Sequence, residues 1–289
     1  MFTKKSLLVL GALGALLGSL PAAAACNEKC LNRALDGYLA QLVKHDPAPL
    51  KVSANLIAVE NAKPVALGQG SWQSVASLPI GMRFADASTS QIVYFGAVKD
   101  KDGKTGSLFL RLKVADGRIA ESELFTRGAY TGEGQETPGM LEPDILYDAI
   151  VPEARRSTRD QLKGVVNAYM EGISKHDGAL FPASYRCDRY QAGRKWTNAP
   201  DNPPERGGGT CQGSMANLKG QEVVNRRFPV MIPELGIAVG LFIIPHAERD
   251  PKGATNVAEV FKIVDGKVRS IEEFSFVAGF PPSSGFADE

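Results

Sequence analysis

The chain has few residues that could bind a metal ion. Its 289 residues include four cysteines and three histidines, with no CxxC or HxxxH spacing. Structural zinc sites use four Cys or His ligands, mostly in closely spaced pairs that this chain lacks, so we expect no metal site. The chain also lacks GxSxG, Walker and dinucleotide-binding motifs, which argues against phosphoryl transfer and redox chemistry with a bound cofactor. We therefore expect no cofactor, and cofactor-free proton chemistry stays open.

An excess of charge of one sign is also missing. The 33 basic and 32 acidic residues give a net charge of +1, and loss of Lys4 and Lys5 with an N-terminal signal would give 33 − 2 − 32 = −1. Such a balance favours neither nucleic acid nor an anionic membrane surface as a partner.

A long apolar run occurs at the N-terminus. Residues 1–25 carry two lysines, an apolar stretch and then alanines, which is the order of a secretory signal peptide. The run from Leu7 to Leu20 is short for a membrane-spanning helix, which needs ~20 apolar residues. We predict cleavage near Ala25 and a periplasmic protein that is free of the membrane. Lipidation of Cys26 is the alternative, although position 23 is alanine where a lipoprotein signal normally has leucine.

The four cysteines can pair in three ways, and an oxidising compartment favours pairing. Their spacing suggests two local bridges. Cys187 and Cys211 bracket a loop rich in proline and glycine, whereas Cys26 and Cys30 are four apart and can be bridged only outside regular helix.

One segment of the sequence occurs twice. YLAQLVKHD, from Tyr38 to Asp46, returns 131 residues later as YMEGISKHD, from Tyr169 to Asp177. Both copies have the apolar spacing of a helix, with the tyrosine facing the core. The helix dipole and turn chemistry explain the terminal His-Asp pair in each copy, so the repeat indicates a duplicated fold unit.

Each half also ends with a similar hairpin. Residues 108–125 and 260–276 each contain two alternating strands around an Asp-Gly turn. Two β-rich runs, 91–99 and 236–246, precede these hairpins. The order of elements predicts an α+β fold of two tandem cone-shaped domains, each with N-terminal helices packed on a curved antiparallel sheet.

We predict five segments in the chain. Ser157–Asp160 is a plausible capping box for the second long helix. The segments are a signal peptide (1–25), a first domain (26–127), a linker (128–156), a second domain with a disulfide-bracketed insertion (157–280) and a tail (281–289).

Several motifs point to a known superfamily. Besides the Tyr-containing helices and the Asp-Gly hairpins, residues 60–72 have the form ENxxxxxLGxGxW. Together they resemble the SnoaL-like branch of the nuclear transport factor 2-like superfamily. The second half resembles an extended two-domain bacterial and fungal group, through YRCDRYQAG (185–193), WTNAP (196–200), Cys211, NRRFPV (225–230) and Pro245-His246. Asp188, Gln191 and Ala192 depart from the CNRxENG usual in that group. The resemblance implies an apolar pocket between sheet and helices.

Two polar residues fall among apolar ones in predicted strands of the second half. Arg226 shares the period-two face of Phe228 and Val230. A buried arginine requires either an internal ion pair or an anionic or phenolic substrate oxygen. His246 ends a strand whose face-mates are apolar, and it is either a general acid or base at the pocket mouth or a turn residue.

The richest cluster of polar residues surrounds Cys187. A bridge to Cys211 would hold Tyr185, Asp188 and Arg189 in fixed positions, as acid–base chemistry requires. The alternative is a disulfide that only holds the loop in place, with an ion pair on the surface beside it. The remaining candidates for lining the pocket are Tyr169, Trp196 and Asn198.

The resemblance extends to sphingomonad γ-formaldehyde lyases. It implies a cofactor-independent lyase that acts on an apolar aromatic substrate, a lignin-derived diarylpropane or phenylcoumaran. We expect His246 or Asp188 to be the base, and Arg226 and Tyr185 to stabilise the phenol or oxyanion. Tyr169, Arg189, Trp196 and Asn198 would contact the substrate.

Two other functions remain open. One is a non-catalytic periplasmic protein that binds a hydrophobic small molecule. The other is a dehydratase or isomerase of the ketosteroid isomerase type, which needs a carboxylate deep in the cone. Glu60 and Asp86 in the first half are its loose candidates. We place the working pocket in the second half and expect the first half to support the fold or form a dimer.

Overall fold

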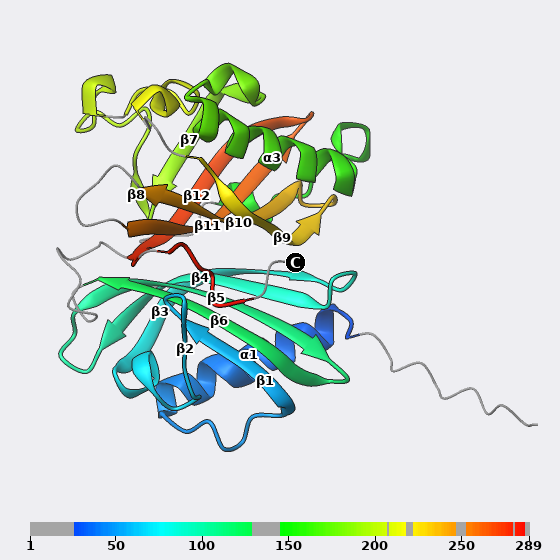
Figure 1. Cartoon of the computed structure of the whole chain (residues 1–289). Helices are drawn as coiled ribbons and strands as arrows, with labels where there is room; N and C mark the ends of the chain where they lie inside the picture. The colour runs from blue at the N-terminus through cyan, green and yellow to red at the C-terminus, as the bar shows by residue number, and fades with distance from the viewer. Residues whose placement is uncertain are drawn as a thin grey trace, which may run out of the picture.

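A computed structural model describes residues 26–128, 145–206, 208–217, 222–246, 253–279 and 281–286. The expected signal peptide and most of the expected linker lie outside these residues. The described chain forms two α+β halves, each with one long helix packed on a six-stranded sheet (Figure 1). This is the fold class that the sequence predicts.

The first half is built around a sheet with strand order β2-β1-β6-β5-β4-β3. Its elements are α1 (Glu28–Lys44), β1 (Val52–Glu60), β2 (Lys63–Pro64), η1 (Gly70–Gln73), β3 (Val75–Asp86), β4 (Gln91–Asp100), β5 (Thr105–Ala115) and β6 (Arg118–Gly128).

The second half repeats this arrangement with strand order β8-β7-β12-β11-β10-β9. Its main elements are α3 (Arg159–Lys175), β7 (Ala183–Gln191), β8 (Arg194–Lys195), β9 (Val224–Ile232), β10 (Ile237–His246), β11 (Gly253–Val264) and β12 (Lys267–Ala278). Short helices are α2 (Ile145–Asp148), η3 (Glu153–Arg155), η4 (Gly178–Leu180), η5 (Pro204–Arg206) and η6 (Gly213–Asn217).

The sheets are mixed rather than fully antiparallel. The first long strand of each half runs parallel to the last one, in the pairs β1–β6 and β7–β12. All other neighbours are antiparallel. The expectation of antiparallel sheets is wrong for this one pair in each half. The strand that follows the helix (β1 or β7) pairs with the last hairpin strand (β6 or β12), and the two run in the same direction.

The repeated sequence forms equivalent helices. Thr158 caps α3, since its hydroxyl accepts from the backbone N–H of Gln161 and the Gln161 side chain accepts from the Thr158 N–H. The helices end at His45 and His176, which adopt φ of 60° and 57°. His-Asp therefore marks the helix ends in both copies.

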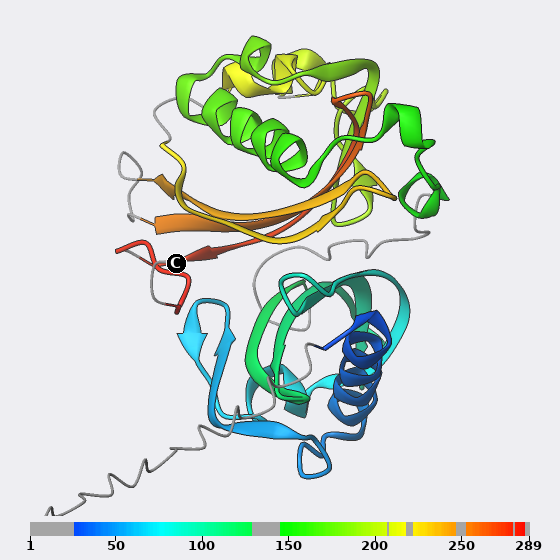
Figure 2. The ribbon, with the colours of Figure 1, turned by 90° about the vertical axis from the view of Figure 1, so that its right-hand side faces the viewer.

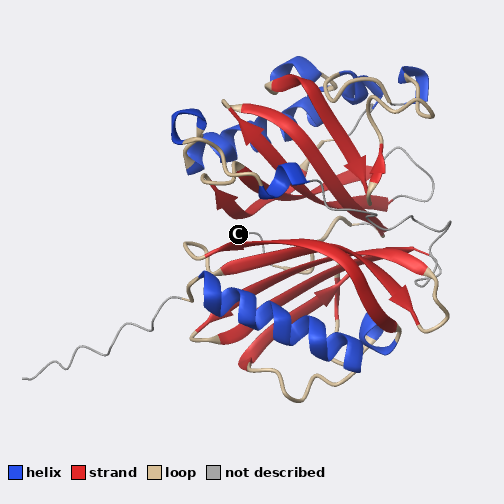
Figure 3. Ribbon diagram, turned by 180° about the vertical axis from the view of Figure 1, so that it is seen from behind, coloured by secondary structure: helices blue, strands red, loops and turns tan. Residues whose placement is uncertain are grey.

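The two sheets pack against each other, and the long helices lie on the outer sides of the molecule (Figures 1, 2 and 3). Between the sheets, the ring centroids of Phe95 and Phe274 are 5.4 Å apart, and those of Phe125 and Phe276 are 4.7 Å apart. These apolar contacts join the two halves into one core.

The disulfides Cys26–Cys30 and Cys187–Cys211 are both formed. They confirm the pairing predicted from the spacing and indicate an oxidising, extracytoplasmic compartment. Within the described part of the chain, every helix is too short or too polar to cross a bilayer.

Candidate functional site in the second half

The helix-facing side of the second sheet carries charged residues among apolar ones. Glu259 lies on β11 between Val257 and Phe261, which both belong to the apolar cluster under α3. Glu273 lies directly opposite Glu259 on β12. Both carboxylates are almost fully buried, with 1% and 4% of their surface exposed. Two buried acids side by side require specific partners.

Tyr169 is the first of these partners. Its hydroxyl donates to Oε1 of Glu259 at 2.9 Å. The ring is held by edge contacts with Phe181 and Phe261, at centroid distances of 5.2 and 5.0 Å. The tyrosine of the repeated helix thus points at a carboxylate in the second half.

Arg189 of β7 lies between the two carboxylates. Its Nε is 3.5 Å from Oε1 of Glu259, an ion-pair distance, and its guanidinium also contacts Glu273. Glu273 accepts two further hydrogen bonds, from Gln191 at 3.1 Å and from the Ser275 hydroxyl at 2.8 Å. One cation therefore serves two acids, and Glu273 has the more complete set of donors.

The surroundings change the proton affinity of this cluster. Burial raises the pKa of Glu259 to about 7, although Arg189 and the Tyr169 hydroxyl act in the opposite sense. Burial and the neighbouring Glu259 also raise the pKa of Tyr169 above its usual range. Oε2 of Glu259 is buried and has no hydrogen-bond partner among the described residues. The cluster combines an acid that titrates near neutrality with a phenol that stays protonated.

His246 lies at the end of β10, on the strand that carries the apolar residues Phe242 and Ile244. Its Nε2 is 2.8 Å from the Thr255 hydroxyl. The imidazole is partly exposed. His246 is thus at one end of the sheet, away from the Glu259–Glu273 pair in the strand register.

The structure separates the cluster predicted around Cys187. Asp188 and Arg189 are neighbours on β7, so their side chains point to opposite faces of the sheet. The Asp188 carboxylate accepts from Lys195 and from the Asn198 amide, at 2.9 and 2.8 Å. Tyr185 is 99% exposed. Tyr185 and Asp188 are therefore removed from the candidate site, and Arg189 remains.

The two loop residues expected to line the pocket support β7 instead. The Asn198 amide donates to the Cys187 carbonyl at 2.9 Å. The Trp196 backbone N–H donates to the Arg189 carbonyl at 2.8 Å, and its side chain is partly buried. These bonds fix the strand that presents Arg189.

Arg226 forms an internal ion pair, which is the first of the two alternatives. Its Nη1 is 2.8 Å from Glu171 and 2.9 Å from the Asn167 amide oxygen, both on α3. Two register irregularities between β9 and β10 disturb the strict alternation. Arg226 and Phe228 face the helix as a result, whereas Val230 packs between the sheets.

The two carboxylates considered in the first half have structural partners. Glu60 accepts from the backbone N–H and the hydroxyl of Ser71. Asp86 accepts from Arg159 at 2.7 Å and from the Met231 N–H at 2.8 Å, so it joins the two halves. The buried carboxylate that contacts the tyrosine of the repeated helix is that of Glu259, in the other half.

The sequence contained a signal for these missed residues. In VAEVFKI, Glu259 occupies the same period-two face as Val257 and Phe261. Glu272 and Glu273 are adjacent, so one of them must face the helix. In the described ranges, no three His, Cys, Asp or Glu side chains are grouped as metal ligands.

The solved structures that resemble the chain match it at low identity, and some of them are named as putative isomerases or as a putative hydroxylase. Residues 155–275 match a family model described as a domain of unknown function, DUF8021. No curated protein matches the chain. A protein of unknown function with a cystatin-like fold from Methylobium petroleophilum PM1 is 15% identical, with a TM-score of 0.33, over 46% of this chain and 84% of that one. AusH from Aspergillus nidulans is 16% identical, with a TM-score of 0.30, over 41% and 86%.

Proposed function

We propose that the second half is a periplasmic, cofactor-independent acid–base enzyme in which Glu259 exchanges a proton with the substrate. The observation that carries this proposal is a buried carboxylate with a pKa near 7 and one oxygen that has no partner among the described residues. A general acid or base works best when its pKa lies near the operating pH. Buried acids with shifted pKa values are concentrated at functional sites.

The other members of the cluster would play supporting roles. The Tyr169 hydroxyl stays protonated and can donate to developing negative charge. Arg189 supplies the cation, and Glu273 balances it. The apolar side chains around the cluster, which include Phe181, Phe242 and Phe261, suit an uncharged aromatic substrate.

For the reaction we propose release of formaldehyde from a diarylpropane or phenylcoumaran. Glu259 would take the proton of the γ-hydroxyl group, the bond between the β and γ carbons would break, and formaldehyde would leave. The electrons of that bond would form an alkene as the benzylic carbon–oxygen bond breaks. The leaving oxygen would take a proton, so the step needs no oxidant or reductant. His246 lies six residues along β10 from Gly240, the residue paired with Glu259, which is too far to deliver that proton, so the proton would come from solvent.

Two alternatives each have a supporting observation. The position of Glu259 is what an isomerase or dehydratase of the ketosteroid isomerase type requires. The internal pairing of Arg226 with Glu171 favours a binding protein, because it leaves that arginine occupied.

The test is formaldehyde release from a diarylpropane diol by the purified mature protein without added cofactor. We expect Glu259→Gln, which keeps the side-chain shape, to reduce turnover by about 10²-fold or more. Unchanged turnover in this variant would refute the role of Glu259. Double-bond migration in a 3-ketosteroid without formaldehyde release would favour the isomerase, and saturable binding without turnover of either compound would favour the binding protein.

The duplicated tyrosine provides a matched control. Tyr169→Phe removes the donor to Glu259, and we expect turnover to fall by roughly 10²-fold. Tyr38→Phe removes the equivalent hydroxyl of the first half, which bonds Ser122 and Trp72, and should leave turnover unchanged. Equal losses in both variants would point to a general effect on folding.

A further inference from the structure

A pocket lies beside the first turns of α3, between that helix and the Asp-Gly turn that joins β11 to β12. It has a volume of about 500 Å³, which is within the usual range of small-molecule sites. No residue of the Glu259 cluster lines it, so a ligand here would be independent of the proposed reaction. We call this the α3 pocket; Arg156, Ser157, Gln161, Gly164, Val165 and Pro182 are among the residues that line it.

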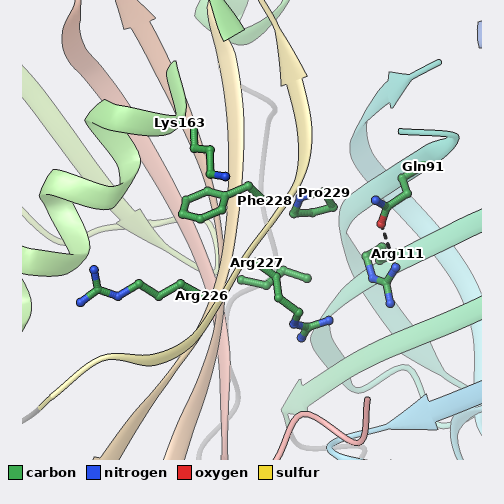
Figure 4. A pocket seen from close by; sticks show the side chains of 8 residues that line it. Gln91, Arg111, Lys163, Arg226, Arg227, Phe228 and Pro229 are labelled. Carbon is green, nitrogen blue, oxygen red and sulfur yellow. Dashed lines mark hydrogen bonds between the residues drawn. The ribbon is translucent and has the colours of Figure 1, made fainter. Parts of the chain in front are cut away.

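The arginines of another cleft, beside β9, bind carboxylates within the protein. In this cleft, shown in Figure 4, Arg226 pairs with Glu171 at 2.8 Å. Arg111 and Arg227 both pair with Glu123, at 2.7 and 2.6 Å. Each of these three arginines already has a carboxylate partner, so none of them needs an anionic ligand.

Arg156 of the α3 pocket differs from these arginines. Its Nε donates to the Val151 carbonyl at 2.8 Å, which holds the guanidinium beside the pocket. Among the described residues, no carboxylate lies within ion-pair distance of this guanidinium. The neighbouring Arg155, by contrast, pairs with Asp265 at 2.6 Å. The pocket therefore has one guanidinium that is available to an anion.

Ser157 supplies a second polar group to the pocket. Only 4% of its surface is exposed, although it lines the pocket. Its hydroxyl has no hydrogen-bond partner in the parts of the chain that the structure describes. Buried polar groups in proteins are nearly always hydrogen-bonded, so an acceptor atom in the pocket would satisfy this hydroxyl.

The first half has a disulfide at the equivalent place. The repeated helices are offset by 131 residues, so Ser157 and Gln161 correspond to Cys26 and Cys30. These two cysteines are bridged and pack against the apolar cluster under α1. The fold is thus satisfied by an apolar crosslink at this place, and it does not require the polar groups of the second half.

We propose that the α3 pocket binds a small aliphatic carboxylate. The Arg156 guanidinium and the Ser157 hydroxyl would donate to its oxygens. Val165, Ala168 and Pro182 would contact its apolar part. The residues that line the pocket include no aromatic side chain, so an aromatic ligand would find no ring on which to stack.

Calorimetric titration of the mature protein with sodium hexanoate tests this proposal. We expect saturable binding that weakens as salt is added, and binding of the uncharged hexanamide that is weaker by about 10-fold or more. Sodium benzoate and inorganic phosphate should also bind more weakly than hexanoate. Absence of saturable hexanoate binding would overturn the proposal. Binding of benzoate or phosphate that equals or exceeds it would overturn the choice of an aliphatic anion.

Three substitutions locate the binding. Arg156→Gln removes the guanidinium and should weaken hexanoate binding by about 10-fold or more. Arg33→Gln removes the same charge from an exposed position of α1 in the first half, and it should leave the affinity unchanged. Ser157→Ala should weaken binding by roughly 5-fold. Equal effects of the two arginine variants would show a dependence on net charge alone and overturn the assignment.

Gly164 allows a variant that blocks the pocket without disturbing the fold. Apart from the backbone of α3 itself, a Cβ added at Gly164 meets no atom of the described residues within 4 Å, and the equivalent residue of α1 is Arg33. Gly164→Leu should weaken hexanoate binding by about 10-fold or more, while the urea midpoint stays the same or rises, because leucine favours a helix more than glycine does. Unchanged affinity in this variant would show that hexanoate binds elsewhere.

Discussion

The two halves have the same chain path but opposite chemistry beneath their helices. Counted from the Asp-Gly turns at 116 and 265, positions in the second hairpin lie 149 residues after those in the first. Glu259 and Glu273 therefore correspond to Leu110 and Leu124, which are 0% and 2% exposed. The fold is satisfied by leucine at both places, so it does not need the two acids.

The repeated tyrosine shows the same difference. Tyr38 bonds the neutral groups of Ser122 and Trp72, and burial raises its pKa to about 12. Tyr169 bonds the carboxylate of Glu259. The comparison indicates that the structural role of this tyrosine is common to both halves, and that the acid–base environment belongs to the second alone.

The largest effect should come from removing the cation that the second half requires. Arg189→Met would leave Glu259 and Glu273 buried without it. We expect the free energy of unfolding to fall by about 3–5 kcal/mol at pH 7, as measured by urea denaturation.

A variant that imitates the first half serves as the control. Combining Arg189→Met with Glu259→Leu and Glu273→Leu removes all three charges together. Stability should return to within about 2 kcal/mol of the original protein, because an apolar replacement of a buried ion cluster is often neutral or stabilising. If the triple variant were as unstable as Arg189→Met alone, the charges would be integral to the fold and the comparison would fail.

The disulfides should differ in the next largest effect. Cys187 and Cys211 are separated by 24 positions and Cys26 and Cys30 by four. From loop-closure entropy, replacing both cysteines by alanine should cost about 3 kcal/mol in the second half and about 2 kcal/mol in the first. Urea denaturation of the two double variants measures this difference. A larger loss in the first half would show that Cys26–Cys30 has a role beyond closing its short loop.

The smallest effect concerns an acid that occupies the same place in both hairpins. Burial raises the pKa of Glu272 to about 8, and its backbone donor is Gly193. Burial acts in the same direction on Glu123, but Arg111 and Arg227 outweigh it and lower the pKa below its usual range.

These opposite shifts give opposite responses to pH. The stability linked to Glu272 is present below the ordinary pKa of a glutamate and is lost as pH rises through about 8. Glu272→Gln should thus change little at pH 5 and stabilise the protein by on the order of 2 kcal/mol at pH 9. Glu123→Gln should destabilise it at pH 7, with a deficit that shrinks as pH falls. Thermal unfolding across this pH range measures both, and parallel curves for the two variants would contradict the assignment.

Much of the fold could be predicted because its signals are local. The repeated helices, the Asp-Gly hairpins and the two disulfides each depend on residues close together in the sequence. The parallel pairs β1–β6 and β7–β12 join segments that are far apart, and strand periodicity carries no information about their direction.

The candidate site was harder to predict because it depends on which way single residues face. Arg189 was identified, but its neighbour Asp188 points to the other side of β7. The register irregularities in β9 break the alternation on which the expectation for Arg226 rested. The sequence marks Glu259 only as an acid on an apolar face, because its partners Tyr169 and Arg189 come from the distant elements α3 and β7.

The contact between the two sheets has a consequence for how the protein could diverge. β6 faces β12 and β3 faces β9, so equivalent strands meet across the interface, as the same surface patch does in a twofold-symmetric dimer. In a homodimer, every substitution appears in both copies. In a single chain with two halves, one copy can keep a leucine while the other acquires a glutamate. The half with the apolar interior can then stabilise the chain while the other half carries buried charges.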